Sequence, residues 1–426
     1  MARVLHRHWR ASLDGGLSRR DRRGCEYEAY LPDPLAARRF RLDGDVAAEV
    51  ADAEAAIRRS NTMASALADT EALARLLLRA ESVASSHIEG LVIGGRRLLR
   101  EEAAQAMGEA PSDVTAAEVL GNIEAMNWAV HALAAATTIT VHDLLEMHRR
   151  LLASTRLAEH AGQIRTEQNW IGGSSFNPCS AAFVPPPHEY VEDLLNDLCA
   201  FVSNDALPPV AQAAIAHAQF ETIHPFVDGN GRTGRALIHV VLRRRGLAPR
   251  MLPPVSLVLA TWAKSYIDGL VATRYQGRPD AHAAHDGMNR WIALFAAACR
   301  RAVDDATDFE TRVTNIEESW RAALGRVRAG SAVELLLRVL PGAPIISVTG
   351  AADLIGRSFQ ATNDAMRRLV AAGVVRQVSV GRRNRAYEAT AITDAFTALE
   401  RQLASRASNT LTAPPRRPAP ARPQRR

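Results

Sequence analysis

An apolar helical stretch that runs into a glycine-rich loop constrains this chain more than any other part of its sequence. Residues 208–223 are apolar enough for a buried helix, and residues 224–235 follow as HPFVDGNGRTGR. Gly229 and Gly231 allow the backbone to turn tightly and to approach a ligand closely. The helical pattern resumes near Arg232. The stretch therefore predicts a helix, a tight loop and the N-terminus of a second helix.

The start of that second helix has the properties of an anion-binding site. Its unpaired backbone N–H groups favour phosphate, and Arg232 and Arg235 lie on one face of its first turn, where both guanidinium groups reach the same anion. Asp228 is a candidate Mg²⁺ ligand, because Mg²⁺ takes one or two carboxylates plus phosphate oxygens. His224 is suited to take a proton from a hydroxyl nucleophile. Together these residues predict group transfer from a nucleotide polyphosphate, without the P-loop pattern GxxxxGK[ST].

HPFVDGNGRTGR resembles the signature H-x-F-x-[D/E]-G-N-G-R-x-x-R of the Fic family at every defining position. The similarity extends through a helical core at about residues 115–300. It implies transfer of AMP from ATP to a Ser, Thr or Tyr hydroxyl of a protein, with Mg²⁺ held by Asp228 and His224 as the catalytic base. It further implies that the nucleotide is bound by Gly229, Asn230, Gly231, Arg232, Gly234 and Arg235.

A second match lies at residues 85–90, SSHIEG, at the end of a predicted helix. Taken alone, this is an ordinary helix end with a glycine cap, although an acid there is unfavourable with the helix dipole and requires a partner. Self-inhibited Fic proteins carry [S/T]-x-x-x-E-[G/N], which Ser85, Glu89 and Gly90 match. The resemblance implies an N-terminal inhibitory helix whose Glu89 pairs with Arg235 and keeps ATP unproductive. In some members the same glutamate positions a water that removes AMP.

Residues 169–187, NWIGGSSFNPCSAAFVPPP, indicate a hairpin between helices. They resemble the flap of the family, where an exposed edge pairs with an extended target segment; Ile171, Gly172 and Gly173 are its candidate target-binding residues. An ordinary surface hairpin is the alternative. Farther along, Tyr266 and Asn289 lie on segments that resemble the helices closing over the adenine, and simple packing is the alternative for each.

The amino-acid composition indicates the class of protein. The chain of 426 residues is 47% hydrophobic, 23% charged and only 5% aromatic, which favours a helical globular protein over a sheet. Four widely spaced cysteines without a CxxC pair predict neither a zinc site nor a disulfide framework. With no apolar run that would span a membrane and no apolar signal segment, a cytoplasmic location is expected.

The C-terminal part, residues 331–400, predicts a separate winged helix-turn-helix, with two helices followed by a strand, a turn and a strand. Its arginines could contact phosphates of DNA: Arg357, Arg367, Arg368, Arg382, Arg383 and Arg385. Protein docking or dimerisation is the alternative. The remaining boundaries are an N-terminal region at 1–113, a core at 114–305, a linker at 306–330 and a disordered basic tail at 401–426.

The combined prediction is a mainly α protein with a β-hairpin flap and a small C-terminal winged helix. Its expected activity is that of a self-inhibited protein adenylyltransferase, with ATP as substrate, Mg²⁺ as cofactor and an unknown protein target that includes itself. Two alternatives stay open: removal of AMP by a water at Glu89, and a DNA-binding regulator whose core senses a nucleotide.

Overall fold

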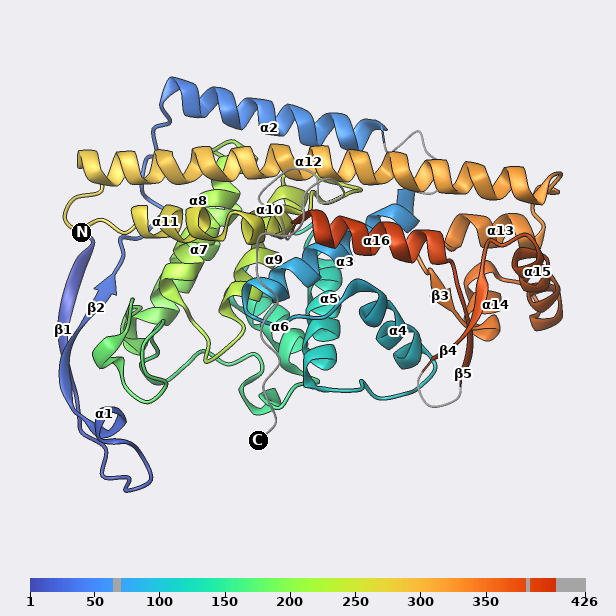
Figure 1. The fold of residues 1–426 in the computed structure, drawn as a ribbon. Coiled ribbons are helices and arrows are strands. Elements are labelled where there is room, and N and C mark those ends of the chain that lie inside the picture. The colour runs from blue at the N-terminus through green and yellow to red at the C-terminus, as the bar shows by residue number, and fades with distance from the viewer. Residues whose placement is uncertain (64–69, 381–383, 404–426) are drawn as a thin grey trace.

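The computed structural model describes residues 1–63, 70–380 and 384–403 (Figure 1). Helices dominate the fold, and the predicted mainly α class is confirmed. The central helices are α5 (Val114–Ala132), α6 (Val141–Leu152), α7 (Val191–Ser203), α8 (Pro209–Ile223) and α9 (Asn230–Arg244); short 3₁₀ turns lie at Ala158–His160, Pro178–Ser180 and His188–Tyr190.

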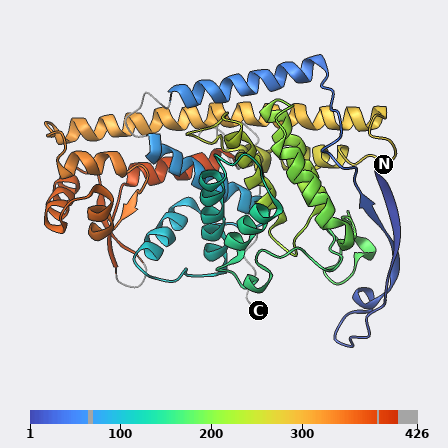
Figure 2. The ribbon, with the colours of Figure 1, turned by 180° about the vertical axis from the view of Figure 1, so that it is seen from behind.

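Helix α8 is at the centre of the main core. All of its residues are buried, as expected for a helix that is apolar on every side. The long helix α12 (His282–Leu324) crosses the whole molecule, and α2 (Gly44–Met63) runs along its outer side (Figures 1 and 2). The Trp291 indole N–H of α12 donates to the Ala214 carbonyl at 2.7 Å, which fixes α12 against α8. This core holds the end of α8, and therefore the loop that follows it, in a rigid frame.

Helix α3 (Thr70–Ile88) packs along α9 and α10 (Val255–Thr261). Glu81 and Ser85 of α3, and Glu89 just beyond its last residue, recur at four-residue spacing and so follow one face of the helix. Glu81 is fully buried and accepts hydrogen bonds from His239 Nε2 at 2.7 Å and from the Ser256 backbone N–H at 2.7 Å. A buried carboxylate requires such partners, so these bonds set the register of α3 on α9.

The sequence pattern at residues 254–273 predicts one helix, but the structure has two, α10 and α11 (Ala263–Ala272). A bend of 98° separates them at Trp262, whose backbone leaves the helical region. No single helix within the described ranges is long and apolar enough to cross a membrane, and α10 with α11 meets that test only as a bent pair. Helix α4 (Gly95–Ala106) was not predicted.

Two predictions that involve the N-terminal 31 residues are wrong. Their richness in Arg, Gly and Pro predicts irregular structure over residues 1–45 apart from a short apolar piece at 27–31, but β1 (Arg3–Trp9) pairs antiparallel with β2 (Cys25–Leu31), with a short helix α1 (Arg19–Arg22) between them. We name residues 3–31 the N-terminal hairpin. No residue of β1 is buried, so its sequence lacks the apolar alternation that marks a half-buried strand.

The second correction concerns the cysteines. Cys25 and Cys179 form a disulfide, with Cα atoms 5.7 Å apart, although no disulfide was predicted. The partners are 154 residues apart in sequence, and only the packing of the N-terminal hairpin against the flap brings them together. Cys199 and Cys299 are buried free thiols.

The C-terminal part begins with α13 (Ala332–Val339) and contains α14 (Val348–Ile355), α15 (Phe359–Ala371) and α16 (Thr390–Leu403). A small sheet has the order β3-β5-β4, formed by β3 (Ile345–Ile346), β4 (Arg376–Val380) and β5 (Asn384–Glu388). The helices and strands expected here are present, while the winged-helix assignment stays a prediction. Apolar residues of α3 and α4 share one hydrophobic core with this part. Arg382, Arg383 and the tail beyond Leu403 lie outside the described residues.

Candidate active site

The loop between α8 and α9 holds the predicted base in an unusual backbone conformation. His224 ends α8 with φ 49° and ψ 62°, and it is the one non-glycine residue with positive φ in the described chain. The Asn230 side chain closes the loop, because its Oδ1 accepts from the Phe226 N–H and its Nδ2 donates to the Phe226 carbonyl, both at 2.8 Å. Backbone strain of this kind persists where surrounding contacts enforce it and is frequent at functional sites.

His148 on α6 supports the same loop and was not predicted. Its ring stacks on Phe226 with centroids 3.8 Å apart. Its Nδ1 accepts from the Gly162 N–H at 3.0 Å, so Nε2 carries the proton and donates to the Asp228 carbonyl at 3.0 Å. Burial lowers the pKa of His148 to about 4, which keeps the ring neutral and this tautomer in place.

The flap, residues 169–187, is tied at its base to the loop. The Asn169 amide donates to the carbonyls of His224 and Phe226, at 3.0 and 3.1 Å. Arg165, which is buried, donates from Nε to the His224 carbonyl at 2.9 Å and from Nη2 to the Pro186 carbonyl at 2.6 Å. A shift of the flap is therefore transmitted directly to His224.

The predicted flap residues form the turn of the hairpin. Ile171 exchanges backbone hydrogen bonds with Phe183, and Gly172 and Gly173 follow with φ of 77° and 79°. A Cβ at Gly173 would lie 2.4 Å from the Ser180 carbonyl oxygen, so this close approach requires glycine.

The two arginines of the predicted anion cradle are almost fully buried. Arg232 is held by Glu118 of α5, with Nη1 3.3 Å from Oε2, and its Nη2 lies 3.5 Å from Asp228 Oδ2. Arg235 donates to Ser85 Oγ at 2.9 Å, to the Ser85 carbonyl at 2.7 Å and to Glu89 Oε1 at 2.7 Å. The predicted contact between Glu89 and Arg235 is therefore present, and Gly90 follows with φ 83° as a helix cap.

Glu89 also fills the space over the anion cradle. A Cβ built on Gly231 would lie 1.9 Å from Glu89 Oε1, so the carboxylate lies against the glycine that lets a ligand approach the start of α9. Burial alone would raise the pKa of Glu89, but Arg235, Arg232 and His224 together hold this pKa below its ordinary value. The carboxylate is therefore ionised at neutral pH and occupies a place suited to a phosphate oxygen.

His224 is electrostatically prepared to accept a proton. Burial lowers its pKa to about 4, and the negative charge of Glu89 offsets only part of this effect. The imidazole is therefore neutral at pH 7, which is the form that a general base requires.

Three other residues were predicted to bind the nucleotide, and the structure gives them packing or hydrogen-bond contacts within the fold. Gly234 faces α8, where a Cβ would lie 2.8 Å from Glu221 Oε1, so its role in the structure is close helix packing. The Tyr266 hydroxyl lies 2.8 Å from His217 Nε2, within the buried surroundings of Arg235. Asn289 is not brought to the cradle: its side chain bonds to the Asp43 N–H at 3.0 Å and to the carbonyls of Arg41 and His285.

Two buried groups beside the site were not anticipated. Burial raises the pKa of Glu221, one turn before His224, to about 7. The guanidinium carbon of Arg274 lies 3.5 Å from the centre of the Phe183 ring in the flap, and its buried Nε has no hydrogen-bond partner among the described residues. Nothing in the local sequence marks these residues, because both act through tertiary packing.

Asp228 fits the predicted metal position. Its side chain is about half exposed, at 48%, and Oδ1 accepts the Gly229 N–H at 2.7 Å. Oδ2 is directed to Arg232 only at 3.5 Å. One carboxylate that keeps free lone pairs beside an anion cradle suits Mg²⁺, which completes its coordination with phosphate oxygens and water.

The fold and site thus define a helical protein in which a histidine lies beside two buried arginines at a helix N-terminus, and comparisons with known proteins identify similar families. The Fic/DOC family model matches residues 138–242, and the Fic/DOC family N-terminal model matches residues 47–131. The chain therefore carries a region similar to the Fic/DOC domain, preceded by a region similar to the N-terminal part of that family.

Two relatives and one solved structure illustrate the similarity. Protein adenylyltransferase fic-1 of Caenorhabditis elegans is 33% identical over 184 residues, which cover 42% of this chain and 33% of that protein. Protein adenylyltransferase Fic of Drosophila willistoni is 37% identical over 136 residues, covering 32% of this chain and 26% of that protein. The chain thus spans about a third or less of these relatives' length.

A Fic family protein from Desulfovibrio desulfuricans G20 has a similar crystal structure. Its TM-score is 0.50 at 20% sequence identity, and the match covers 82% of this chain and 97% of that chain. At this identity the likeness concerns the fold alone.

Proposed function

We propose that this protein transfers AMP from ATP to a hydroxyl group of a target protein, and that Glu89 restrains the reaction. The single observation that carries the proposal is the position of the Glu89 carboxylate, against Gly231 and bonded to Arg235, beside the neutral imidazole of His224. An anion site, a base and an internal anion that competes for the site thus lie together. The names of the related adenylyltransferases support the same activity.

In the proposed reaction, His224 accepts the proton of the target hydroxyl as its oxygen attacks the α-phosphorus of ATP. The bond to the bridging oxygen breaks, and pyrophosphate leaves with that electron pair. Arg232, Arg235 and the backbone N–H groups at the start of α9 stabilise the charge on the phosphates. Mg²⁺, held by Asp228, neutralises further phosphate charge when bound.

The restraint follows from geometry. While Glu89 holds Arg235, that guanidinium is not available to a terminal phosphate, and the carboxylate repels an anion placed over Gly231. ATP would then bind with its phosphates displaced from the position that attack requires. Ser85 reinforces this state by accepting a second bond from Arg235.

Asp228→Ala is expected to abolish Mg²⁺-dependent transfer in a Glu89→Gly background, with a loss of at least about 100-fold, since a bound metal supplies several kcal/mol of charge stabilisation. Asp228→Asn is the matched control, because its amide oxygen still accepts the Gly229 N–H but carries no charge. Transfer rates over a Mg²⁺ titration provide the measurement. Full activity of both variants at low Mg²⁺ would contradict the metal assignment.

The lowered pKa of His224 predicts an unusual pH profile. A base whose pKa falls from 6.5 to about 4 stays neutral in more acidic solution, so the acid limb of kcat/KM should shift well below pH 6.5. Loss of Glu89, whose charge raises this pKa, should shift the limb further in the same direction. The measurement is kcat/KM of Glu89→Gly between pH 4.5 and 8, and a midpoint near 6.5 would contradict the assigned environment.

We further propose that the target docks on the flap and that the reaction takes place in the cytoplasm, where ATP is available. Ile171 pairs inward with Phe183 in one isolated bridge, and Gly172 beside it is exposed, so we place target docking at the outer edge of the first flap arm, at residues 170–172. That edge suits strand addition by an extended target segment.

For residues 331–400, we propose a protein partner or a second copy of the chain rather than DNA. Leu354, Phe359 and Val370 are exposed apolar residues on α14 and α15, which is typical of protein contacts. Arg368 donates to the carbonyls of Leu324 and Arg326 and is therefore engaged within the fold. A salt-dependent DNA shift by the full chain would overturn this proposal.

A further inference from the structure

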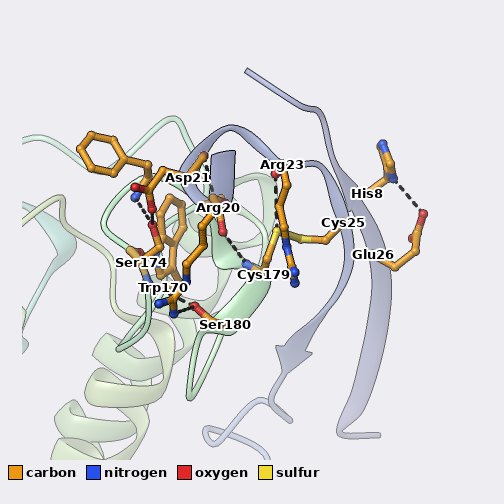
Figure 3. Close-up of a disulfide and its surroundings, with 12 residues drawn as sticks. His8, Arg20, Asp21, Arg23, Cys25, Glu26, Trp170, Ser174, Cys179 and Ser180 are labelled. Atoms are coloured by element: carbon orange, nitrogen blue, oxygen red, sulfur yellow. Dashed lines mark hydrogen bonds and ion pairs between the residues drawn. A yellow bond between two sulfur atoms is a disulfide. The ribbon is translucent and has the colours of Figure 1, made fainter. Parts of the chain in front are cut away.

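The tip of the flap is clasped by the N-terminal hairpin. Beside the Cys25–Cys179 disulfide, Ser174 Oγ donates to Asp21 Oδ1 at 2.6 Å (Figure 3). The Asn177 amide donates to the carbonyls of Arg20 and Asp21 at 3.1 and 2.9 Å. We name these contacts the clasp. They join residues 20–25 to residues 174–179, which are far apart in sequence.

The N-terminal hairpin contacts the flap at further points besides the clasp. The Tyr30 N–H of β2 donates to the Val184 carbonyl at 3.0 Å, so the second flap arm is already backed by the hairpin. The outer edge of the first arm, at Trp170 and Gly172, is not used by this contact. The Trp9 ring meets the Trp170 ring at 5.3 Å, edge to face. The hairpin therefore contacts the flap at its tip, at its second arm and at Trp170.

The flap passes this support on to the catalytic loop. Its base residue Asn169 bonds to the carbonyls of His224 and Phe226, and Arg165 bonds to the carbonyls of His224 and Pro186. A continuous set of contacts thus runs from Cys25 through the flap to His224. Whatever fixes the tip of the flap also restricts the position of the target relative to the base.

The two cysteines of the clasp are the ones that a reductant reaches. Cys25 and Cys179 are partly exposed, whereas Cys199 and Cys299 are buried. Burial raises the pKa of the Cys199 thiol to about 12 and also raises that of Cys299. Since the thiolate is the reactive form, these two thiols are unreactive in exchange.

We infer that the Cys25–Cys179 disulfide is a redox control of target docking: in the oxidised protein the flap is held ready for the target, and reduction releases its tip. The expected effect of the disulfide on catalysis rests on the proposed function, whereas its expected effect on the flap does not. Removing the cross-link leaves the tip held by a few partly exposed hydrogen bonds, each of small net value. A cross-link between residues so distant in sequence restricts the chain strongly.

The exchange balances with a dithiol as reductant. One thiolate of the dithiol attacks a sulfur of the Cys25–Cys179 bond and forms a mixed disulfide. Its second thiol resolves that bond, so two electrons and two protons pass to Cys25 and Cys179, and the reductant becomes a disulfide. A small-molecule disulfide such as oxidised glutathione reverses the reaction.

The first experiment examines the flap without relying on catalysis. The full chain is equilibrated with dithiothreitol or with oxidised glutathione, the thiols are alkylated and counted by mass spectrometry, and amide hydrogen exchange is followed. Reduction should raise exchange of residues 170–183 at least about tenfold while α9 is unchanged. The Cys25→Ser/Cys179→Ser double variant should behave as the reduced protein in both buffers. Equal flap exchange in both states, or a redox response of the double variant as large as that of the wild type, would overturn the inference.

The second experiment measures target docking. Glu89→Gly serves as the enzyme, and Glu89→Gly/His224→Ala serves as an acceptor copy. Reduction of the enzyme should raise KM for the acceptor about tenfold through loss of preorganisation, with little change in KM for ATP. A KM for the acceptor that does not depend on the redox state would overturn the inference. Absence of transfer in both redox states would count against the proposed function instead. Hydrogen exchange alone would then test whether the disulfide controls the flap.

Discussion

Glu89→Gly is expected to raise AMP transfer about 100-fold over wild type, because loss of one partner of an enclosed charge pair shifts an equilibrium by about 3 kcal/mol. The substitution removes two obstacles together. It frees Arg235, whose Nη2 lies 2.7 Å from Glu89 Oε1, and it clears the space over Gly231. The measurement is the initial rate of AMP incorporation with saturating ATP and Mg²⁺.

Two matched variants separate these obstacles. Glu89→Gln removes the charge but keeps a side chain of nearly the same size, so it should give an intermediate rate. Glu71→Gln changes an exposed glutamate in the first turn of the same helix and should leave the rate at the wild-type level. A Glu89→Gly protein that is no faster than wild type, although folded and able to bind ATP, would remove the inhibitory role.

His224→Ala in the Glu89→Gly background is expected to lower transfer by at least about 100-fold, since a positioned general base contributes roughly 10²–10⁴-fold. The neutral imidazole of His224 lies beside the anion cradle. His148 on α6 also contacts the loop, but it is stacked on Phe226 and bonded through both ring nitrogens, so it cannot replace His224 as the base. ATP binding, measured by calorimetry, should change little.

His224→Asn is the control for backbone effects. His224 has φ 49°, and asparagine tolerates this region better than alanine does. Both variants should lose transfer equally, while Asn should retain more of the thermal stability. Transfer by either variant at the rate of Glu89→Gly alone would show that another group accepts the proton.

Much of the fold follows from local pattern. The apolar run at residues 208–223 predicted α8 within one residue at its start, and the glycine-rich loop predicted a second helix from near Arg232, whereas α9 begins at Asn230. The N-terminal hairpin was missed because β1 has no fully buried residue and its sequence lacks apolar alternation. The break between α10 and α11 was missed because apolar periodicity continues across it.

The residues of the site show the same difference between local sequence patterns and tertiary contacts. Residues whose roles depend on a short contiguous pattern, His224, Asp228, Arg232 and Arg235, were found from the sequence and do lie together. Arg165, His148 and Glu118 were missed, since each acts through a fold contact with a residue more than 50 positions away. Asn289 was proposed for adenine on likeness alone, and its hydrogen bonds instead fix the segment at residues 41–43.

The disulfide could not be predicted for a similar reason. Cysteine spacing has meaning when the pattern is local, but Cys25 and Cys179 meet only after the hairpin has packed against the flap. No disulfide was predicted, because the four cysteines lie far apart in the sequence without CxxC spacing. In a reducing compartment Cys25 and Cys179 would be two thiols. The change between the thiol and disulfide forms is what would produce a redox response of the flap.

The most direct measurement is intact-mass spectrometry of Glu89→Gly incubated with ATP and Mg²⁺, beside wild type and Glu89→Gly/His224→Ala. Self-modification by one AMP in Glu89→Gly alone is the result expected if His224 is the base and Glu89 the restraint. An unmodified Glu89→Gly protein that binds ATP, or equal modification of the double variant, would contradict the proposed reaction.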